Sequence, residues 1–367
     1  MTSRAAWHLL SGEYPPERGG VSDYTRQLAR GLADRGEFVH VWVPQTVGAE
    51  PRDPGVEVHR VRGLGPGGLR EIDRHVALLP RPRRWFVQYV PTGLGLHGMN
   101  VPLIRWLCAI EDEVWVQFHE VALGWQLWRK PHHHLIHGVQ LWMAAALARR
   151  AERIFISIEG WRPRLGREAD RAVWLPIPSN IPVQVSPAQE ASARELLGPG
   201  PWVAHFGTYG TGITRDLVPA LQLIARKRTD VRFLLLGRGG ERAAATLPQD
   251  RVLAPGELPA SSLAALLKVA TLALQPFPDG ISARRTSAMG PLALGVPVVS
   301  TVGPLTDSVW HDGGVALALA GAPSALARIA LELLRDNEHR TALGQRGAAL
   351  YRRFFSLERT CEVLQGC

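Results

Sequence analysis

The sequence predicts an α/β protein built from two Rossmann-like domains that face each other across a cleft. The chain has 367 residues, more than a single hydrophobic core usually holds. Two series of apolar, strand-like runs alternate with helical patterns, and a stretch rich in Pro and Gly separates them. In each series a Gly-rich loop follows the first strand. Alternation of this kind indicates parallel strands joined by right-handed crossovers.

The first series opens with a short apolar run at 5–10, and the loop SGEYPPERGG follows it. Val21, Tyr24 and Leu28 then repeat at helical spacing, and Gly36 ends the predicted helix. Further buried strands are expected at residues 38–43, 85–89, 114–118 and 153–157.

The second series repeats this pattern, with a strand at 202–206, a Gly-rich loop and a helix around 217–226. Further strands are expected at 231–236, 271–274 and 296–300, and further helices at 288–294, 322–335 and 338–355. The predicted boundaries are a first domain at 1–180, a linker at 181–200, a second domain at 201–345 and a C-terminal helix at 346–367 that returns towards the first domain.

Composition excludes several classes of protein. Cys108, Cys361 and Cys367 show no spacing typical of a metal site or a disulfide framework, which favours the cytoplasm. No run approaches the roughly 20 apolar residues that a membrane helix needs. The net charge of +9 favours anionic partners, although a genome that prefers Arg would explain it equally well.

Ligands of open parallel sheets bind beyond the carboxyl ends of the strands, and this rule selects the candidate site. In the first half, the candidates at or beside these ends are Glu13, Gly19, Gly20, Tyr24, Gln88, His119 and Glu120. In the second half, they are Gly207, Thr208, Gly210, Arg215, Gly237, Ser282, Arg284, Arg285 and Thr286.

Two loops of the second half have the chemistry of a phosphate site. In FGTYGTG, Gly207 and Gly210 allow backbone N–H groups to approach a phosphate closely. This loop does not match the dinucleotide pattern G-x-G-x-x-G, and it has no P-loop lysine. Arg284 and Arg285 precede a predicted helix, where two guanidinium groups at a helix N-terminus would bind a diphosphate. The alternative is a solvated turn that happens to be basic.

Several motifs resemble, in order and spacing, the retaining glycosyltransferases of the GT-B fold, family 4 (group 1). They are GEYPPERGGVSDYTRQLARGLADRG, QYVPTGLG, HFGTYG, LLLGRGGE and LALGVPVVST. The resemblance covers most of the chain. It implies transfer of a sugar from a nucleotide-diphosphate sugar to a hydroxyl acceptor with retention of configuration. It also implies that no divalent metal or other cofactor is needed, with the donor on the second domain and the acceptor on the first.

The chain departs from this family at a central place. Many members carry two glutamates eight positions apart, and the matching positions here are Ser282 and Gly290. Arg284 and Arg285 occupy the family's small-residue phosphate turn, so we expect them to stabilise charge on the leaving diphosphate. His119 matches a histidine that lines the cleft near the transferred sugar, although a purely structural histidine is the alternative.

The resemblance also assigns each of the other candidate residues to the donor or to the acceptor. Gly19 and Gly20 are expected to make the closest backbone approach to the donor from the first domain. The residues expected to contact the donor are Gly207, Thr208, Gly210, Arg215, Gly237, Ser282 and Thr286, and those on the acceptor side are Glu13, Tyr24, Gln88 and Glu120.

Residues 125–150 leave two interpretations open. Trp125, Trp128, Arg129, Lys130 and Trp142 could form a surface that contacts an anionic membrane from the cytoplasm, or a core helix with its tryptophans facing inward. The nearby residues His132, His133, His134 and His137 have no carboxylate or Cys beside them, so we expect no metal there.

Three rival functions remain. One is a sugar phosphorylase or epimerase on the same fold, of which an epimerase would need carboxylates that the sequence does not place. A degenerate transferase acting as a partner subunit is favoured by the loss of both glutamates. Modification of nucleic acid is suggested only by the net charge, and no nucleic-acid-binding motif supports it.

Overall fold

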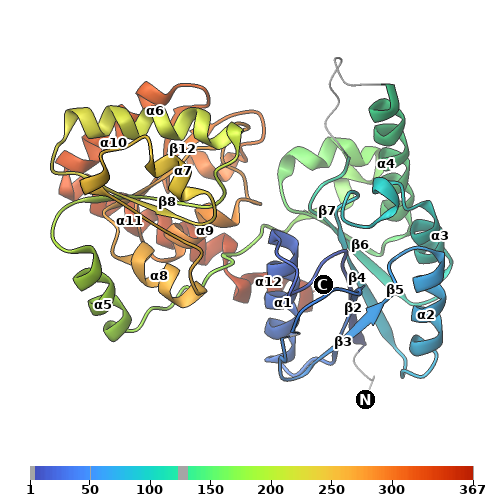
Figure 1. Cartoon of the computed structure of the whole chain (residues 1–367). Coiled ribbons are helices and arrows are strands. Elements are labelled where there is room, and N and C mark those ends of the chain that lie inside the picture. Colours follow the sequence, from blue (N-terminus) through green and yellow to red (C-terminus); the bar gives the residue numbers. More distant parts are fainter. Residues whose placement is uncertain (1–4, 50, 123–130, 367) are drawn as a thin grey trace. The chain divides into compact units, whose positions relative to one another are not determined.

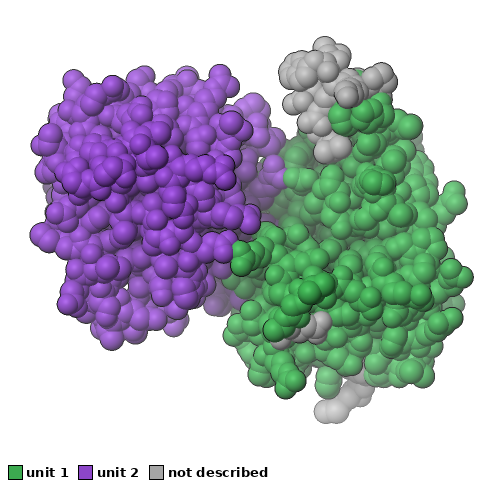
Figure 2. Space-filling view, viewed as in Figure 1, with its two compact units in different colours: residues 1–176, 360–367 green, residues 177–359 purple. Residues whose placement is uncertain are grey.

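The structure, a computed structural model, describes residues 5–49, 51–122 and 131–366. It divides into two compact units, which Figure 2 shows in separate colours. Unit 1 comprises residues 1–176 and 360–367, and unit 2 comprises residues 177–359.

Unit 1 is built on a seven-stranded sheet in which every paired strand is parallel (Figure 1). Its strands are β1 (Ala6–Leu10), β2 (Val39–Pro44), β3 (Val56–Val61), β4 (Arg83–Tyr89), β5 (Glu113–Phe118), β6 (Arg153–Ile156) and β7 (Ala172–Trp174). Their order in the sheet is β3-β2-β1-β4-β5-β6-β7. This is the dinucleotide-binding order 3-2-1-4-5-6 with one strand added, and its switch point lies between β1 and β4.

The core of unit 1 is rich in aromatic side chains. Trp7 of β1 packs edge-on against Trp115 of β5, with ring centroids 5.4 Å apart. The guanidinium of Arg84 lies 4.1 Å from the centre of the Trp115 ring, so a charged group closes this cluster through a cation–π contact. Trp85 is fully buried as well. Burial of such large rings contributes much of the apolar area that stabilises this unit.

Helices cover the sheet of unit 1. They are α1 (Gly20–Ala33), α2 (Pro66–Val76), α3 (Val101–Ala109) and α4 (Pro131–Arg150), with short 3-10 segments at Leu96–Gly98 and Glu159–Arg171. The last helix, α12 (Leu357–Gln365), contributes its final residues to unit 1. There the Gln365 amide donates a hydrogen bond to Glu37 at 2.8 Å. Within the described part of the chain, no helix combines the length and the apolarity needed to cross a membrane.

Unit 2 repeats this architecture with a six-stranded, all-parallel sheet. Its strands are β8 (Trp202–Phe206), β9 (Arg232–Leu236), β10 (Val252–Gly256), β11 (Leu272–Gln275), β12 (Val298–Val302) and β13 (Ala316–Leu319). The order is β10-β9-β8-β11-β12-β13, which is the 3-2-1-4-5-6 order again. The predicted fold class, two Rossmann-like domains, is therefore confirmed.

The helices of unit 2 bury apolar residues in its interior. They are α5 (Pro187–Leu197), α6 (Thr211–Lys227), α7 (Gly240–Ala244), α8 (Ala260–Lys268), α9 (Thr286–Ala293), α10 (Pro323–Arg335) and α11 (Asn337–Leu350), with a π-helical turn at Tyr351–Phe355 and 3-10 turns at Gln249–Arg251 and Ser308–His311. Leu217, Leu221 and Ile224 of α6 recur at helical spacing and are fully buried in the core of the sheet.

The segment at 181–200, expected to be a linker, lies within unit 2 and contains a helix. Helix α5 begins with a capping box. The Ser186 hydroxyl accepts a hydrogen bond from the backbone N–H of Gln189, and the Gln189 side-chain oxygen accepts one from the backbone N–H of Ser186. Ala193 and Leu197 are buried. The prolines at 182 and 187 therefore precede and begin a helix instead of marking a flexible connection.

Candidate functional site

The first candidate residues lie where β1 leads into α1. The carboxylate of Glu13 accepts a hydrogen bond of 2.9 Å from the backbone N–H of Ser22, in the first turn of α1. A helix N-terminus attracts negative charge, so Glu13 stabilises this one from a neighbouring loop. Glu13, expected on the acceptor side, is thus engaged with the helix that follows it.

The two glycines before this helix differ in their surroundings. A Cβ added at Gly19 would lie 2.2 Å from a carboxylate oxygen of Glu13. A Cβ added at Gly20 would have no neighbour within 4 Å. Both residues were predicted to approach the donor closely. Of these two glycines, only Gly19 is crowded, and the Glu13 carboxylate is what crowds it.

His119, Gln88 and Tyr24 are brought together at the carboxyl ends of β4 and β5. The Nε2 atom of His119 lies 2.6 Å from the Oε1 atom of Gln88, and the Tyr24 ring packs edge-on against the His119 ring at 5.4 Å. The Tyr24 hydroxyl donates to Gln117 at 2.8 Å. Burial raises the pKa of Tyr24 far above its usual range, so it stays protonated and remains a donor.

These neighbours define what His119 can do. Its side chain is 6% exposed, whereas Tyr24 and Gln88 are each 1% exposed. Its backbone is anchored as well, because its N–H donates to the carbonyl of Tyr89 and its carbonyl accepts from the indole of Trp161. Tyr24 and Gln88 therefore orient the imidazole, and neither side chain is open to an acceptor in this structure. Glu120 is partly exposed and follows directly.

In unit 2, three loops converge at the carboxyl edge of the sheet. Gly207, which follows β8, has a φ of 147° and donates its N–H to the carbonyl of Leu236. A Cβ at Gly237, after β9, would lie 2.3 Å from the Gly207 carbonyl oxygen. A Cβ at Gly207 would lie 3.3 Å from the Cβ of Ser287 in α9. Glycine is needed here because the backbones touch. The structure thus brings Gly207 and Gly237 beside the N-terminus of α9.

The paired arginines stand at the start of this helix. Arg285 is the residue that precedes α9, and its guanidinium lies 4.9 Å from the centre of the Phe277 ring. One of its nitrogens is 3.8 Å from the carboxylate of Asp279. Arg284 is half-buried beside it, and Thr286 begins the helix. The Arg285 guanidinium is thus held at a helix N-terminus, which attracts anions. A phosphate bound there would compete with Asp279 for this guanidinium.

The two positions that the family fills with glutamates are both buried here. Ser282 is 0% exposed, so its hydroxyl faces no solvent. A Cβ at Gly290 would lie 2.8 Å from Ile181, which packs across this side of α9. A glutamate at 290 would need space that Ile181 occupies. The donor contact predicted for Ser282 therefore requires the loop to move.

Two cavities of unit 2 lie at opposite edges of its sheet. One, of about 460 Å³, opens at the carboxyl edge and is lined by the predicted residues Thr208 and Gly210. Arg238 and Arg242 line it too, whereas Arg215 is exposed on α6 and is not part of its lining. The other, of about 570 Å³, opens at the amino edge beside Lys268 and includes none of the predicted residues. Position in the fold favours the first cavity as part of a ligand site.

Three polar residues of this edge were missed by sequence reasoning. His205 is the last residue but one of β8, within a hydrophobic run. Its Nδ1 donates to the Leu274 carbonyl, and burial lowers its pKa to about 4. Gln275 ends β11 fully buried. The carboxylate of Asp307 accepts from the backbone N–H of Ala283 and so anchors the loop that carries the arginines. A polar residue at the end of an apolar run was the available signal for His205 and Gln275.

The other basic and histidine-rich segment is partly outside the described residues. Trp125, Trp128, Arg129 and Lys130 fall there. His132 and His133 begin α4, with ring centroids 4.2 Å apart.

Comparison with known proteins identifies this part of the chain. The family model described as "Glycosyl transferases group 1" matches residues 202–336. Residues 202–336 therefore resemble a group 1 glycosyl transferase domain. The match spans the sheet of unit 2 together with Gly207, Gly237 and the arginine pair. No curated protein matches this sequence.

Solved structures resemble the whole chain in fold. Sucrose-phosphate synthase from Thermosynechococcus elongatus has a TM-score of 0.73 at 18% identity, covering 99% of this chain and 98% of that one. HepE from Anabaena, solved in complex with UDP and glucose, has a TM-score of 0.70 at 15% identity, covering 99% and 100%. WaaG, a glycosyltransferase involved in lipopolysaccharide biosynthesis, has a TM-score of 0.64 at 14% identity, covering 98% and 100%. The group 1 domain thus belongs to a chain with the GT-B fold.

Proposed function

We propose that this protein is a retaining glycosyltransferase that transfers a sugar from a nucleotide-diphosphate sugar to a hydroxyl acceptor. The observation that carries the proposal is the group 1 match over residues 202–336, because it covers the edge of the sheet where the glycine loops and the arginine pair meet. HepE has been solved with UDP and with UDP-glucose, which supports a uridine diphosphate donor here.

The chemistry assigned to unit 2 is stabilisation of the leaving diphosphate. The backbone N–H groups at the start of α9 and the guanidinium groups of Arg284 and Arg285 would offset the negative charge that develops on its oxygens. Gly207 and Gly237 allow their two loops to pack against each other, and Gly210, which has no neighbour within 4 Å of an added Cβ, would leave room for a phosphate to approach the backbone. In unit 1, Gln88 and Tyr24 would hold the imidazole of His119 in one orientation for the transferred sugar.

We also propose the setting of the reaction. The acceptor would be a hydroxyl of a glycan, a lipid-linked sugar or a small molecule in the cytoplasm. A net charge of +9 suits an acceptor presented at an anionic membrane surface.

The experiment is a panel of UDP-, GDP-, ADP- and TDP-sugars tested first by thermal shift and then for donor hydrolysis. With UDP-glucose as the donor, water acts as a slow acceptor, and proton NMR reads the anomer of the glucose formed before mutarotation. A retaining enzyme releases the α-anomer first. Release of the β-anomer first would overturn retention, while binding and turnover would still support the transferase.

A second function is favoured by one observation. Ser282 and Gly290 replace the two glutamates, and Ile181 fills the space at Gly290. A chain with this site could bind a nucleotide and serve as a non-catalytic partner of an active transferase. Donor binding without hydrolysis for every nucleotide-sugar in the panel would establish this second function in place of the first.

Metal independence is a separate prediction. The diphosphate charge is assigned to helix N-termini and arginines, so turnover should be unchanged after treatment with a chelator such as EDTA. The measurement is the initial rate of donor hydrolysis before and after chelation, with Mg²⁺ added back. A complete loss of rate that Mg²⁺ restores would contradict this prediction.

A further inference from the structure

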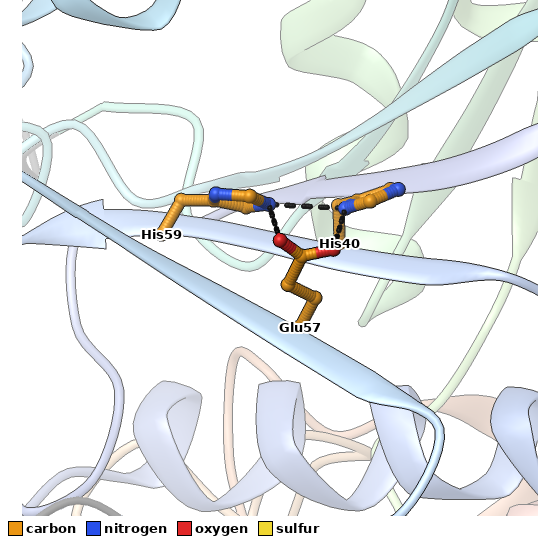
Figure 3. A group of neighbouring side chains, drawn as sticks. All are labelled: His40, Glu57 and His59. Atoms are coloured by element: carbon orange, nitrogen blue, oxygen red, sulfur yellow. Dashed lines mark hydrogen bonds and ion pairs between the residues drawn. The ribbon is translucent and has the colours of Figure 1, made fainter. Parts of the chain in front are cut away.

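Unit 1 contains a histidine cluster that the proposed transferase does not use. His40 of β2 and Glu57 and His59 of β3 point towards one another from two adjacent strands (Figure 3). The register of the sheet explains this, because His40 pairs with Glu57 and Trp42 pairs with His59. Side chains two residues apart on a strand share a face, so all three groups lie on one side of the sheet.

The distances within the cluster match those between the ligands of a tetrahedral metal ion. The Nδ1 atom of His40 is 3.0 Å from the Nε2 atom of His59. Carboxylate oxygens of Glu57 lie 3.3 Å from the first nitrogen and 3.7 Å from the second. Bonds of 2.0–2.1 Å to a tetrahedral zinc ion place its ligand atoms roughly 3.3 Å apart. The two Glu57 distances belong to different oxygens, Oε2 and Oε1, and one ligand atom from each residue lies within 4.8 Å of the others, so a small movement would bring all three to one ion.

Surrounding rings hold the two imidazoles in place. The Trp42 ring stacks on His59 with centroids 4.0 Å apart and an interplanar angle of 11°. The His8 ring stacks on His40 at 4.8 Å. Such packing limits rotation of the rings, so a metal ion would meet ligands that are already oriented.

Charge and access also suit a cation. The carboxylate of Glu57 places a negative charge beside the two imidazole nitrogens. The Glu57 side chain is 63% exposed, whereas those of His40 and His59 are 12% and 14% exposed. An ion can therefore enter from the solvent side, and water can fill the fourth position.

We propose that His40, Glu57 and His59 form a zinc-binding site that joins edge strand β3 to β2. Two imidazole nitrogens and one carboxylate oxygen are ligands that Zn²⁺ prefers. The ion would act on the stability of unit 1 and not on sugar transfer, because its ligands lie in mid-strand and not in the loops at the carboxyl edge. In its absence, His40 and His59 share a hydrogen bond.

The test uses the full-length protein without a histidine tag, stripped with a chelator and desalted. Zn²⁺ is titrated against a chromophoric chelator, and Co²⁺ is added separately to record its visible spectrum. We expect one equivalent of tight binding and an intense Co²⁺ band of the tetrahedral type. Glu57→Gln and His59→Gln should each weaken Zn²⁺ binding by about 10–100-fold or more.

The matched control is His132→Gln, an exposed histidine of α4 that should leave binding unchanged. Zn²⁺ should raise the melting temperature of the wild-type protein and of the control but not that of Glu57→Gln. Glu57 is largely exposed, so its replacement should not prevent folding. Equal Zn²⁺ affinity in the wild type and in Glu57→Gln and His59→Gln would overturn the proposal, as would an octahedral Co²⁺ spectrum.

Discussion

At the scale of single residues, the contacts of Arg285 hold its side chain at the position where we expect a diphosphate to bind. Arg285 is held over the Phe277 ring and near the Asp279 carboxylate. Asp279 is 54% exposed, so its attraction for Arg285 is screened by water. A diphosphate carries more charge than one carboxylate and is also favoured by the end of α9. It should therefore replace Asp279 as the partner of Arg285.

We expect Arg285→Ala to weaken binding of UDP, or of whichever nucleoside diphosphate binds, by about 1–3 kcal/mol, the range for a charge-assisted contact. Isothermal titration measures the affinity. Arg335→Ala is the control, since it removes the same charge from the exposed C-terminal end of α10. An unchanged affinity in both Arg284→Ala and Arg285→Ala would exclude this position for the phosphates.

At the scale of secondary-structure elements, the start of α1 depends on Glu13. The helix begins after Gly19, which provides no side-chain cap, and Glu13 accepts the hydrogen bond from Ser22 in place of a cap. Gly19 is needed because any Cβ would displace this carboxylate, whereas Gly20 has free space beside it. The two adjacent glycines thus have different roles.

We expect Gly19→Ala to destabilise the protein by about 1 kcal/mol or more, since it breaks a capping interaction. Gly20→Ala should leave stability unchanged or raise it slightly, because alanine favours the helix. Urea unfolding monitored by circular dichroism compares the two variants. Equal destabilisation by both would show that Glu13 is not what constrains this loop.

The free space beside Gly20 also allows a test of its role in the donor site. Gly20→Val should fold normally, because the added side chain meets nothing in unit 1 within 4 Å of its Cβ. If Gly20 is the closest backbone approach to the donor sugar, turnover should fall far more than nucleotide affinity. Turnover equal to that of the wild type would remove Gly20 from the donor site.

At the scale of the whole molecule, both units contain buried neutral histidines. Burial lowers the pKa of His205 from 6.5 to about 4 in unit 2, and those of His8 and His59 to about 3 and about 4 in unit 1. In the unfolded chain these groups take up a proton near pH 6.5. Between that pH and the folded pKa, the unfolded state binds more protons, so acid favours unfolding.

We expect stability to be full above about pH 6.5 and to decrease as the pH falls towards 4, with His205 contributing roughly 3 kcal/mol of that loss. Denaturant unfolding at pH 4.5 and pH 7.5 measures the difference. His205→Gln cannot be protonated, so its stability should depend less on pH, even if it is lower overall. An unchanged pH dependence in this variant would contradict the assignment to His205.

The sequence by itself determined the fold class through its central strands. Every strand that it predicted lies inside one of the two sheets: in unit 1 these are β1, β2, β4, β5 and β6, and in unit 2 they are β8, β9, β11 and β12. The four strands that it missed, β3, β7, β10 and β13, are the four edge strands. A central strand is buried on both faces and reads as an apolar run, whereas an edge strand is partly solvated and does not.

The sequence also selected loops for a candidate site, because ligands of parallel sheets bind at one edge. What it could not give was the partner of each side chain. The Glu13 carboxylate bonds to the first turn of α1, the Arg285 guanidinium packs on the Phe277 ring, and Ile181 packs beside Gly290. His40, Glu57 and His59 become neighbours only when β2 and β3 pair in register. The spacing of residues along the chain determines which side chains lie on the same face of a strand. Only the pairing of strands and the packing of loops decide which residues of different elements come into contact.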